Sequence, residues 1–343
     1  MSVPGVRTAQ EIREAPEAVK RQEQALAQPL AELAGRLRRR PPQVVVTCAR
    51  GSSAHAATFG KHLIERYLGI PVASAAPNIA SVYGGKLHLK DQLFLAISQS
   101  GSSADLIDMT ASARASGAVT VCVVNATGSP LAAGCDVVLP MSAGPELSVA
   151  ATKTFIATLS ALLRLTSVWI GDAALAGAVE RLPERLTAAS DLDWSVALDA
   201  LASAGSLVTI GRGPTLAIAR EAALKLKESC NLHAEAFSGA EFLHGPVALV
   251  SPEYPILMFN PTDAAAKGMR QLAANLREKG TDLYTTDPDE DASGRLPVLP
   301  PHHPETDAVC LIQSFYVMAV HLAKRFGTDV DHPRHLRKVT STR

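Results

Sequence analysis

Short apolar runs alternate with longer amphipathic segments along most of the chain. Continuous apolar runs indicate strands buried on both faces, and they occur at residues 44–47, 72–75, 93–97, 119–124 and 137–139. Helical spacing predicts one long helix over residues 9–40, ended by Pro41 and Pro42, and further helices at 54–67, 104–115 and 153–170. Because such alternation is typical of βαβ units, we predict an α/β fold with a doubly wound parallel sheet.

The same alternation of apolar runs and amphipathic segments begins again after a charged, helix-like connector at residues 171–193. Its second occurrence predicts strands at 206–210, 256–259 and 283–285, helices at 215–229, 264–279 and 305–326, and a loop at 287–304. Residues 46–51 align with residues 208–213, so that a strand, a glycine-containing turn and a helix coincide in both copies. We therefore predict an internal repeat and two similar lobes, each a doubly wound parallel sheet flanked by helices.

The predicted boundaries divide the chain into four parts. They are an N-terminal segment at 1–25, a first lobe at 26–180, a second lobe at 195–327 and a C-terminal tail at 328–343. The tail is polar and lacks helical or strand periodicity, which is typical of a disordered terminus. A functional role for the tail requires that it fold over a site.

The charge balance and the cysteines argue against several kinds of binding partner and structural site. The 343 residues contain 33 Lys plus Arg and 33 Asp plus Glu, and no long basic block, so we expect no binding to nucleic acid or to an anionic membrane. The polar N-terminus has no apolar signal-peptide core, and we expect no membrane span and a cytoplasmic location. The five cysteines form no CxxC pair, which argues against a disulfide framework or a zinc site.

Two loops rich in serine and glycine follow predicted strands and precede predicted helices. The first covers residues 50–53, with the sequence RGSS, and the second covers residues 98–103, with the sequence SQSGSS. Hydroxyl groups and free backbone N–H groups at a helix N-terminus suit a phosphate monoester, and glycine allows the backbone to approach it closely. Serines before helices also serve as ordinary N-caps. Neither loop has the glycine pattern of a nucleoside triphosphate or dinucleotide site.

A second group of candidate residues lies on and after the helix predicted at 215–229. Glu221, Lys225 and Glu228 are spaced so that one helix face carries all three side chains. A surface ladder of ion pairs is the alternative to a functional role. Downstream, His233 and His244 accompany two further glutamates in a stretch that glycine and proline prevent from forming one helix. A histidine beside Gly-Pro can reach a cleft and move protons near neutral pH.

Together these stretches resemble the SIS (sugar isomerase) family, and over nearly the whole chain they resemble the isomerase half of glutamine:fructose-6-phosphate amidotransferase. The matching stretches are residues 9–18, 51–53, 98–103, 149–153, 221–228, 233–237, 241–246 and 328–338. The resemblance implies that both lobes have the SIS fold and that the ligand is a sugar phosphate. It implies no metal and no cofactor.

The resemblance also implies roles for individual residues. The phosphate and hydroxyl groups of the sugar would be held by Ser52, Ser98, Gln99, Ser100 and Ser103, and we place Gly51, Ser53, Glu221 and Lys225 in the same substrate-binding set. Glu228 matches the base that moves a proton between C1 and C2, and Lys338 matches a lysine that forms a Schiff base with the ketose. His244 matches the ring-opening histidine, which the neighbouring subunit supplies, so we expect a homodimer with shared active sites. Val149 and Ala151 match positions that touch the sugar, although the family has serine where this chain has Ala151.

The expected activity follows from what these residues do and from the cysteine positions. No cysteine precedes Cys48, and 343 residues leave no room for a glutaminase domain, so we expect no glutamine hydrolysis. Free ammonium is dilute in cells, which favours release: we expect a glucosamine-6-phosphate deaminase (isomerising) that forms fructose 6-phosphate and ammonia. The alternatives are a deaminase or deglycase for another amino-sugar or fructosamine 6-phosphate, ammonia-dependent synthesis of glucosamine 6-phosphate, and a non-catalytic sugar-phosphate sensor.

Overall fold

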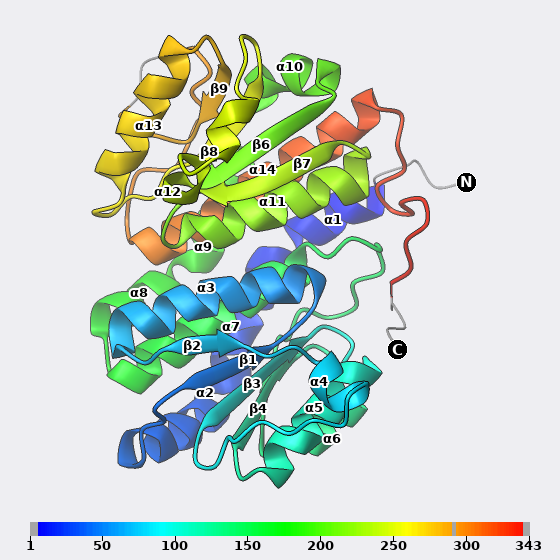
Figure 1. Cartoon of the computed structure of the whole chain (residues 1–343), viewed down its shortest axis with the longest axis vertical. Coiled ribbons are helices and arrows are strands. Elements are labelled where there is room, and N and C mark those ends of the chain that lie inside the picture. The colour runs from blue at the N-terminus through cyan, green and yellow to red at the C-terminus, as the bar shows by residue number, and fades with distance from the viewer. Residues whose placement is uncertain (1–5, 290–292, 339–343) are drawn as a thin grey trace. The chain divides into compact units, whose positions relative to one another are not determined.

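The computed structural model describes residues 6–289 and 293–338, and the chain divides into two compact units. The first, which we call the five-stranded unit, contains residues 17–146, 153–180 and 337–338. The second, the four-stranded unit, contains residues 6–16, 147–152 and the described part of 181–336. Figure 1 shows a parallel sheet with flanking helices in each unit. The α/β fold with two parallel sheets flanked by helices is therefore confirmed.

The sheet of the five-stranded unit has the order β2-β1-β3-β4-β5, with all neighbours parallel. Its strands are β1 (Val45–Cys48), β2 (Val72–Ser74), β3 (Leu93–Ser98), β4 (Val119–Val124) and β5 (Val137–Pro140). Its helices are α2 (Ala15–Arg39), α3 (Gly51–Leu68), α4 (Asn78–Ser81), α5 (Ala104–Ala115), α6 (Pro130–Gly134), α7 (Lys153–Ile170) and α8 (Ala173–Glu180). Alternate strand residues such as Phe94 and Cys122 pack with α5 and α6. Helix α3 packs with α7 and contacts β1, β2 and β3.

The sheet of the four-stranded unit has the order β7-β6-β8-β9, which repeats the order of the first four strands of the other sheet. Its strands are β6 (Ser206–Gly211), β7 (His233–Ser238), β8 (Pro255–Phe259) and β9 (Asp282–Thr285). Its helices are α1 (Val6–Arg13), α9 (Leu182–Ala189), η1 (Ser195–Ala197), α10 (Leu198–Ser203), α11 (Thr215–Cys230), α12 (Gly239–Phe242), η2 (Pro246–Leu249), α13 (Ala266–Glu278) and α14 (Pro304–Arg325). Strand residues such as Ile210 and Met258 pack with α12 and α13, whereas α11 packs against α14.

Three local predictions differ from the structure. The single helix expected over residues 9–40 is two helices, α1 and α2, and Pro16 lies in the first turn of α2, where a missing N–H is tolerated. Helix α3 begins at Gly51 rather than at residue 54; Arg50, with an extended backbone, occupies its N-cap position and makes no side-chain capping hydrogen bond. Strand β7 was not predicted, since its sequence HAEAFS is polar at alternate positions, as suits a strand at a sheet edge.

Helices α7 and α14 are long and apolar enough to span a membrane by length and composition, which the sequence analysis did not anticipate. In the structure, 83% of the apolar window of α7 and 89% of that of α14 are buried inside the protein. Buried core helices satisfy the same length and hydropathy test, and both helices are core helices here.

Candidate active site

The loop at residues 98–103 joins the end of β3 to the beginning of α5 in the five-stranded unit. The Ser98 hydroxyl accepts a hydrogen bond from the Gly101 N–H at 3.1 Å, and the Ser100 hydroxyl accepts one from the Ser102 N–H at 3.3 Å. Ser103 occupies the N-cap position of α5, but its side chain makes no capping hydrogen bond. The Ser103 side chain therefore does not cap α5, and the buried carboxylate of Asp105 accepts a hydrogen bond from the Leu106 N–H in the first turn at 2.9 Å.

The loop at residues 50–53 lies beside the first one, because β1 and β3 are adjacent parallel strands. Gly51 has a positive φ of 52°, and α3 begins there, so Ser52 and Ser53 lie in its first turn. Arg50 joins the two loops: its guanidinium donates to the buried carboxylate of Asp105 on α5 at 2.8 and 3.1 Å. The structure thus brings the two predicted phosphate-binding loops to one edge of one sheet.

Gly101 determines the shape of the second loop. Its φ is 62°, and a Cβ at this position would lie 2.0 Å from the Ser129 hydroxyl oxygen. The Gly101 carbonyl also accepts a hydrogen bond from Leu131 N–H at 3.1 Å. A side chain would therefore displace both the loop and the start of α6.

We predict that Gly101→Ala weakens binding of a sugar phosphate by roughly tenfold or more, since a positive φ alone costs a non-glycine residue about 1–3 kcal/mol. Isothermal titration with glucosamine 6-phosphate measures the change. Gly128→Ala is the matched control, because no heavy atom lies within 4 Å of its added Cβ and its φ is not in the left-handed region. Equal affinities for the two variants would contradict the assigned role of the loop.

Glu221, Lys225 and Glu228 form a buried ion-pair network on α11 in the four-stranded unit. The Lys225 ammonium lies 3.3 Å from Glu221 Oε1 and also contacts Glu228 Oε2. Side-chain exposure is 2% for Lys225 and 0% for Glu221, but 22% for Glu228. Tyr316 on α14 donates a hydrogen bond to Glu221 at 3.2 Å. The pattern is therefore not a surface ladder, and Glu228 is the member of the three that presents surface.

The charge of Lys225 is maintained by its two carboxylates. Burial acts to lower the pKa of this lysine, but the charges of Glu221 and Glu228 and the hydrogen bonds to them outweigh burial and raise it. Lys225 is therefore an ammonium that holds the Glu228 carboxylate in place. Neither Glu221 nor Lys225 presents surface to a ligand, and their assignment to substrate binding stays a prediction.

His244 lies on the loop between α12 and η2 and is exposed. Its backbone N–H donates to the Glu241 carbonyl at 2.9 Å, and Gly245 follows with a φ of 133°. Leu243 and Leu249 on the same stretch are also exposed. This exposure leaves the imidazole accessible. That His244 contributes to the active site of a neighbouring subunit stays a prediction.

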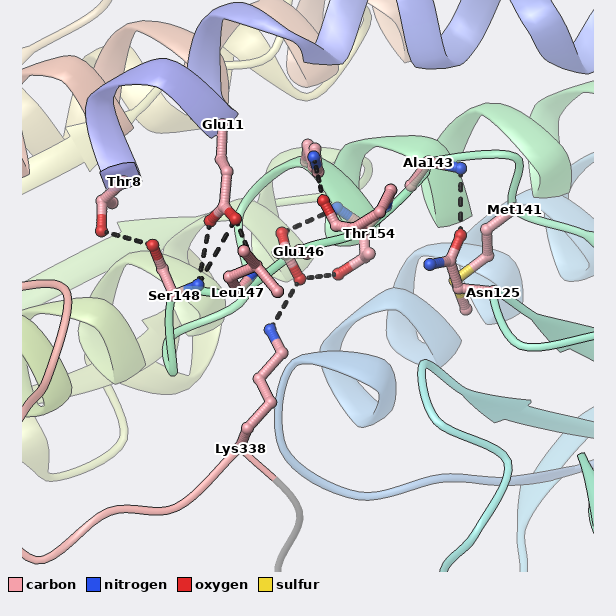
Figure 2. A network of polar contacts seen from close by, with 12 residues as sticks. Thr8, Glu11, Asn125, Met141, Ala143, Glu146, Leu147, Ser148, Thr154 and Lys338 are labelled. Carbon is pink, nitrogen blue, oxygen red and sulfur yellow. Dashed lines mark hydrogen bonds and ion pairs between the residues drawn. The ribbon is translucent and has the colours of Figure 1, made fainter. Parts of the chain in front are cut away.

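The C-terminal tail is anchored in the four-stranded unit through Asp331, which is buried. Its carboxylate accepts hydrogen bonds from the Thr8 N–H at 2.8 Å and the Thr8 hydroxyl at 2.6 Å. The Asp331 carbonyl accepts a hydrogen bond from Val149 N–H at 3.4 Å. The Thr8 hydroxyl oxygen also lies 3.0 Å from the Ser148 hydroxyl, from which it accepts a hydrogen bond (Figure 2). The tail is therefore held beside Val149, a position predicted to touch the sugar.

Glu11 on α1 holds residues 147 and 148, the two residues that precede Val149. Its carboxylate accepts hydrogen bonds from the backbone N–H groups of Leu147 and Ser148 (Figure 2). The sequence analysis assigned no role to Thr8, Glu11 or Asp331. Glu11 and Asp331 lie within stretches that resemble the SIS family, and this resemblance was the only feature of the sequence that could have indicated a role for them.

The contacts of Asp331 predict a pH dependence of stability. Burial acts to raise its pKa, but the hydrogen bonds from Thr8 and Arg7 outweigh burial and lower it below the ordinary value of 3.8. The stabilisation is therefore complete above pH 3.8 and is lost as pH falls through the lower folded-state pKa. We expect Asp331→Asn to lower the free energy of unfolding at pH 7 by about 1–3 kcal/mol, a difference that shrinks in acid.

Urea unfolding of both proteins between pH 7 and the acid limit of folding measures this difference. Asp191→Asn is the control, because Asp191 and its partner Arg13 are both mostly exposed and 3.6 Å apart, and such pairs contribute little. A difference between wild type and Asp331→Asn that does not depend on pH would exclude the charged carboxylate as its cause.

Lys338 belongs to the five-stranded unit, and its ammonium lies 3.0 Å from Oε2 of the buried Glu146 (Figure 2). The structure thus places Lys338 and the two loops predicted to bind phosphate in one unit, and Glu228, His244, Val149 and Ala151 in the other. Val149 and Ala151 are partly buried.

Gln99, in the Ser/Gly loop at residues 98–103, is held through its backbone. Its carbonyl accepts hydrogen bonds from the N–H groups of Asn125 and Ala126 at 3.2 and 3.3 Å.

Two parallel sheets with serine-rich loops at strand ends define an α/β protein of the SIS type, and family comparison agrees. The SIS domain model matches residues 41–167 and 200–287, and the chain belongs to this family.

Relatives and solved structures extend this assignment. The chain is 34% identical over 313 residues to a glutamine–fructose-6-phosphate aminotransferase [isomerizing] of Symbiobacterium thermophilum, covering 86% of this chain and 51% of the relative. It thus spans about half the length of the curated relatives it matches. A crystal structure from Silicibacter pomeroyi DSS-3, provisionally described as a phosphosugar isomerase, is 43% identical with a TM-score of 0.91, covering 96% of this chain and 100% of that one. The C-terminal domain of glucosamine-fructose-6-phosphate aminotransferase from Francisella tularensis is 27% identical with a TM-score of 0.85, covering 95% and 98%.

Proposed function

We propose that the protein is an isomerising glucosamine-6-phosphate deaminase, which converts glucosamine 6-phosphate to fructose 6-phosphate and ammonia. The observation that carries this proposal is the carboxylate of Glu228, which is partly exposed and fixed by the buried ammonium of Lys225. Moving a proton between C1 and C2 of an open-chain sugar requires a base that is ionised and held in one position. The likeness to isomerising aminotransferases supports an amino-sugar phosphate as the substrate.

The phosphate group of the substrate is bound by the two Ser/Gly loops of the five-stranded unit. Both loops stand at helix N-termini, and Gly101 allows the backbone of the second loop to turn toward an anion. Arg50 is engaged with Asp105, so hydroxyl and backbone N–H groups provide the binding. This donor set suits a phosphate monoester of a sugar.

The reaction proceeds in three steps. His244, which we propose comes from the neighbouring subunit of a homodimer, protonates the ring oxygen while the C1 hydroxyl loses its proton, and the sugar opens to the C1 aldehyde. Glu228 then removes the proton from C2 and returns it to C1, and a proton passes from the amine nitrogen to O1, which converts the aldehyde and amine into a C1 alcohol and a C2 imine. Hydrolysis of the imine completes the reaction: the imine nitrogen leaves as ammonia, and the oxygen of water becomes the C2 ketone oxygen of fructose 6-phosphate.

Burial or position keeps the cysteine thiols of this chain away from chemistry at the edge that carries the Ser/Gly loops. Burial raises the pKa of Cys48, Cys230 and Cys310 to about 12, so these thiols are not ionised nucleophiles. The thiol of Cys135 raises the pKa of Cys122 further. Cys135 has a lowered pKa, but it lies between α6 and the amino end of β5, opposite the edge that carries the Ser/Gly loops. Free ammonium is dilute in cells, which favours the releasing direction.

Incubation with glucosamine 6-phosphate, followed by enzymatic assay of ammonium and fructose 6-phosphate, tests the proposal. Equal amounts of both products are expected. Galactosamine 6-phosphate and a fructosamine 6-phosphate belong in the same panel, because Ala151 replaces the serine of the family and alters a predicted sugar contact. Binding of these sugars without any turnover, in either direction, would identify a sensor instead of an enzyme.

A further inference from the structure

We propose that Glu146 positions the amine of Lys338 and takes up its proton when this lysine attacks C2 of the substrate. The inference deepens the proposed deaminase function and rests on it, since it requires that Lys338 meet an open-chain sugar phosphate. It assigns a role to a residue that the sequence analysis did not single out, although Glu146 lies within the region matched by the SIS domain model.

The Glu146 carboxylate is held in place independently of Lys338. Its side chain is fully buried, and it accepts hydrogen bonds from the Thr154 N–H at 3.2 Å and from the Thr154 hydroxyl at 2.6 Å. These contacts hold the carboxylate in one position at the N-terminus of α7. Lys338 adds a third hydrogen bond, to Oε2 at 3.0 Å. Glu146 is thus a preformed acceptor onto which the lysine docks.

The loop that carries Glu146 is rigidly connected to the phosphate-binding edge of the same unit. Asn125, which follows β4, accepts a hydrogen bond from Ala143 N–H at 3.0 Å (Figure 2). Its side-chain amide also donates to the Gly144 carbonyl at 2.8 Å. The Asn125 N–H in turn donates to the carbonyl of Gln99 in the Ser/Gly loop at 3.2 Å. Gln22 donates to the Met141 carbonyl at 2.7 Å. Lys338 is therefore tied through Glu146 to the loop proposed to bind phosphate.

The chemistry needs such an acceptor, because an ammonium has no lone pair with which to attack carbon. Lys338 first transfers one proton to Glu146 Oε2, which leaves a neutral amine and a carboxylic acid. The Nζ lone pair then forms a bond to the protonated C2 imine, and a proton passes from Nζ to the substrate nitrogen. The C2–nitrogen bond breaks, ammonia leaves with the bonding electron pair, and an iminium between C2 and Nζ remains.

The cycle closes with all atoms accounted for. Glu146 gives its proton to the departing ammonia, which leaves as ammonium, and the carboxylate is restored. Water then adds to the iminium carbon, and the C2–Nζ bond breaks to give the ketone and the Lys338 ammonium. Fructose 6-phosphate alone reverses this last step, so it is a probe for the covalent intermediate that needs no amino sugar.

The experiment traps that intermediate with fructose 6-phosphate and cyanoborohydride and follows the adduct by mass spectrometry with peptide mapping. Wild type is expected to form an adduct at Lys338, and Lys338→Arg to form none there. Glu146→Gln should slow trapping at saturating sugar by about 10- to 100-fold, while the Kd for the sugar phosphate changes little. Glu32→Gln makes the same chemical change at an exposed site on α2 and is the matched control.

Each outcome decides the proposal. Trapping in Glu146→Gln as fast as in wild type overturns it, as does the lack of any Lys338 adduct in wild type. A loss due to helix capping would appear equally in Thr154→Val, and that equality would also overturn it. Should Glu146→Gln not fold, Glu146→Asp keeps the charge but shortens the side chain, and a trapping rate equal to wild type would contradict close positioning.

A failure of the proposed deaminase function can be distinguished from a failure of the role proposed for Glu146. Wild type that releases ammonia from glucosamine 6-phosphate but forms no adduct retains the deaminase and refutes the role of Glu146. A Glu146-dependent adduct without ammonia release supports the role of Glu146 and refutes the deaminase.

Discussion

Replacing Glu228 by glutamine should lower kcat for ammonia release by roughly 10²- to 10⁴-fold, the range that general base catalysis supplies. The amide is of similar size and still reaches Lys225, but it cannot accept a proton from C2. Because Glu228 lies in the four-stranded unit and the Ser/Gly loops in the other, the Kd for the sugar phosphate should change little.

Two measurements check this expectation. Deuterium incorporation at C1 of fructose 6-phosphate in heavy water reports proton transfer directly, and calorimetry reports binding. Glu278→Gln on the exposed face of α13 is the control for the chemical change. A fully active Glu228→Gln enzyme would remove this residue as the base, whatever the reaction proves to be.

Lys225→Met should lower the free energy of unfolding by about 3–5 kcal/mol, the cost of leaving a buried charge without its partner. The substitution keeps the volume of the side chain but leaves Glu221, which has no exposed surface, next to Glu228 with no ammonium between them. Repulsion between the carboxylates then opposes the packing of α11 against α14. Activity should fall as well, since Glu228 loses the group that fixes it.

Urea unfolding measures the loss, and a second substitution identifies its cause. Adding Glu221→Gln to Lys225→Met removes the uncompensated buried charge and should recover part of the stability, because Tyr316 can still donate to the amide oxygen. If the double variant is as unstable as Lys225→Met alone, the loss arises from packing and not from charge.

The sequence pattern predicted the sheets well because a strand buried on both faces is a continuous apolar run, and eight of the nine observed strands were expected. The exception, β7, lies at a sheet edge, where His233 and Glu235 remain exposed. These polar residues interrupt the continuous apolar run by which the other strands were recognised. Glu221, Lys225 and Glu228 were grouped correctly because helical spacing is local.

Other members of the candidate site could not be predicted from local patterns. Lys338 lies 192 residues from its partner Glu146, and Thr8 lies 323 residues from its partner Asp331, so no local spacing relates either pair. Their burial is also unforeseeable, since an isolated acidic residue in a loop is usually solvated. Such residues are visible only when the fold has brought their donors together.

The hydrogen bonds between Thr8 and Asp331 have a consequence for biosynthesis. The two hydrogen bonds from Thr8 on α1 to the Asp331 carboxylate cannot form until residue 331, 323 positions further along the chain, has left the ribosome. Contacts between such distant positions form late, because they close the longest loop. The segment that leads to Lys338 is therefore among the last to be ordered, and a nascent or C-terminally truncated chain would hold folded sheets but no lysine with which to act.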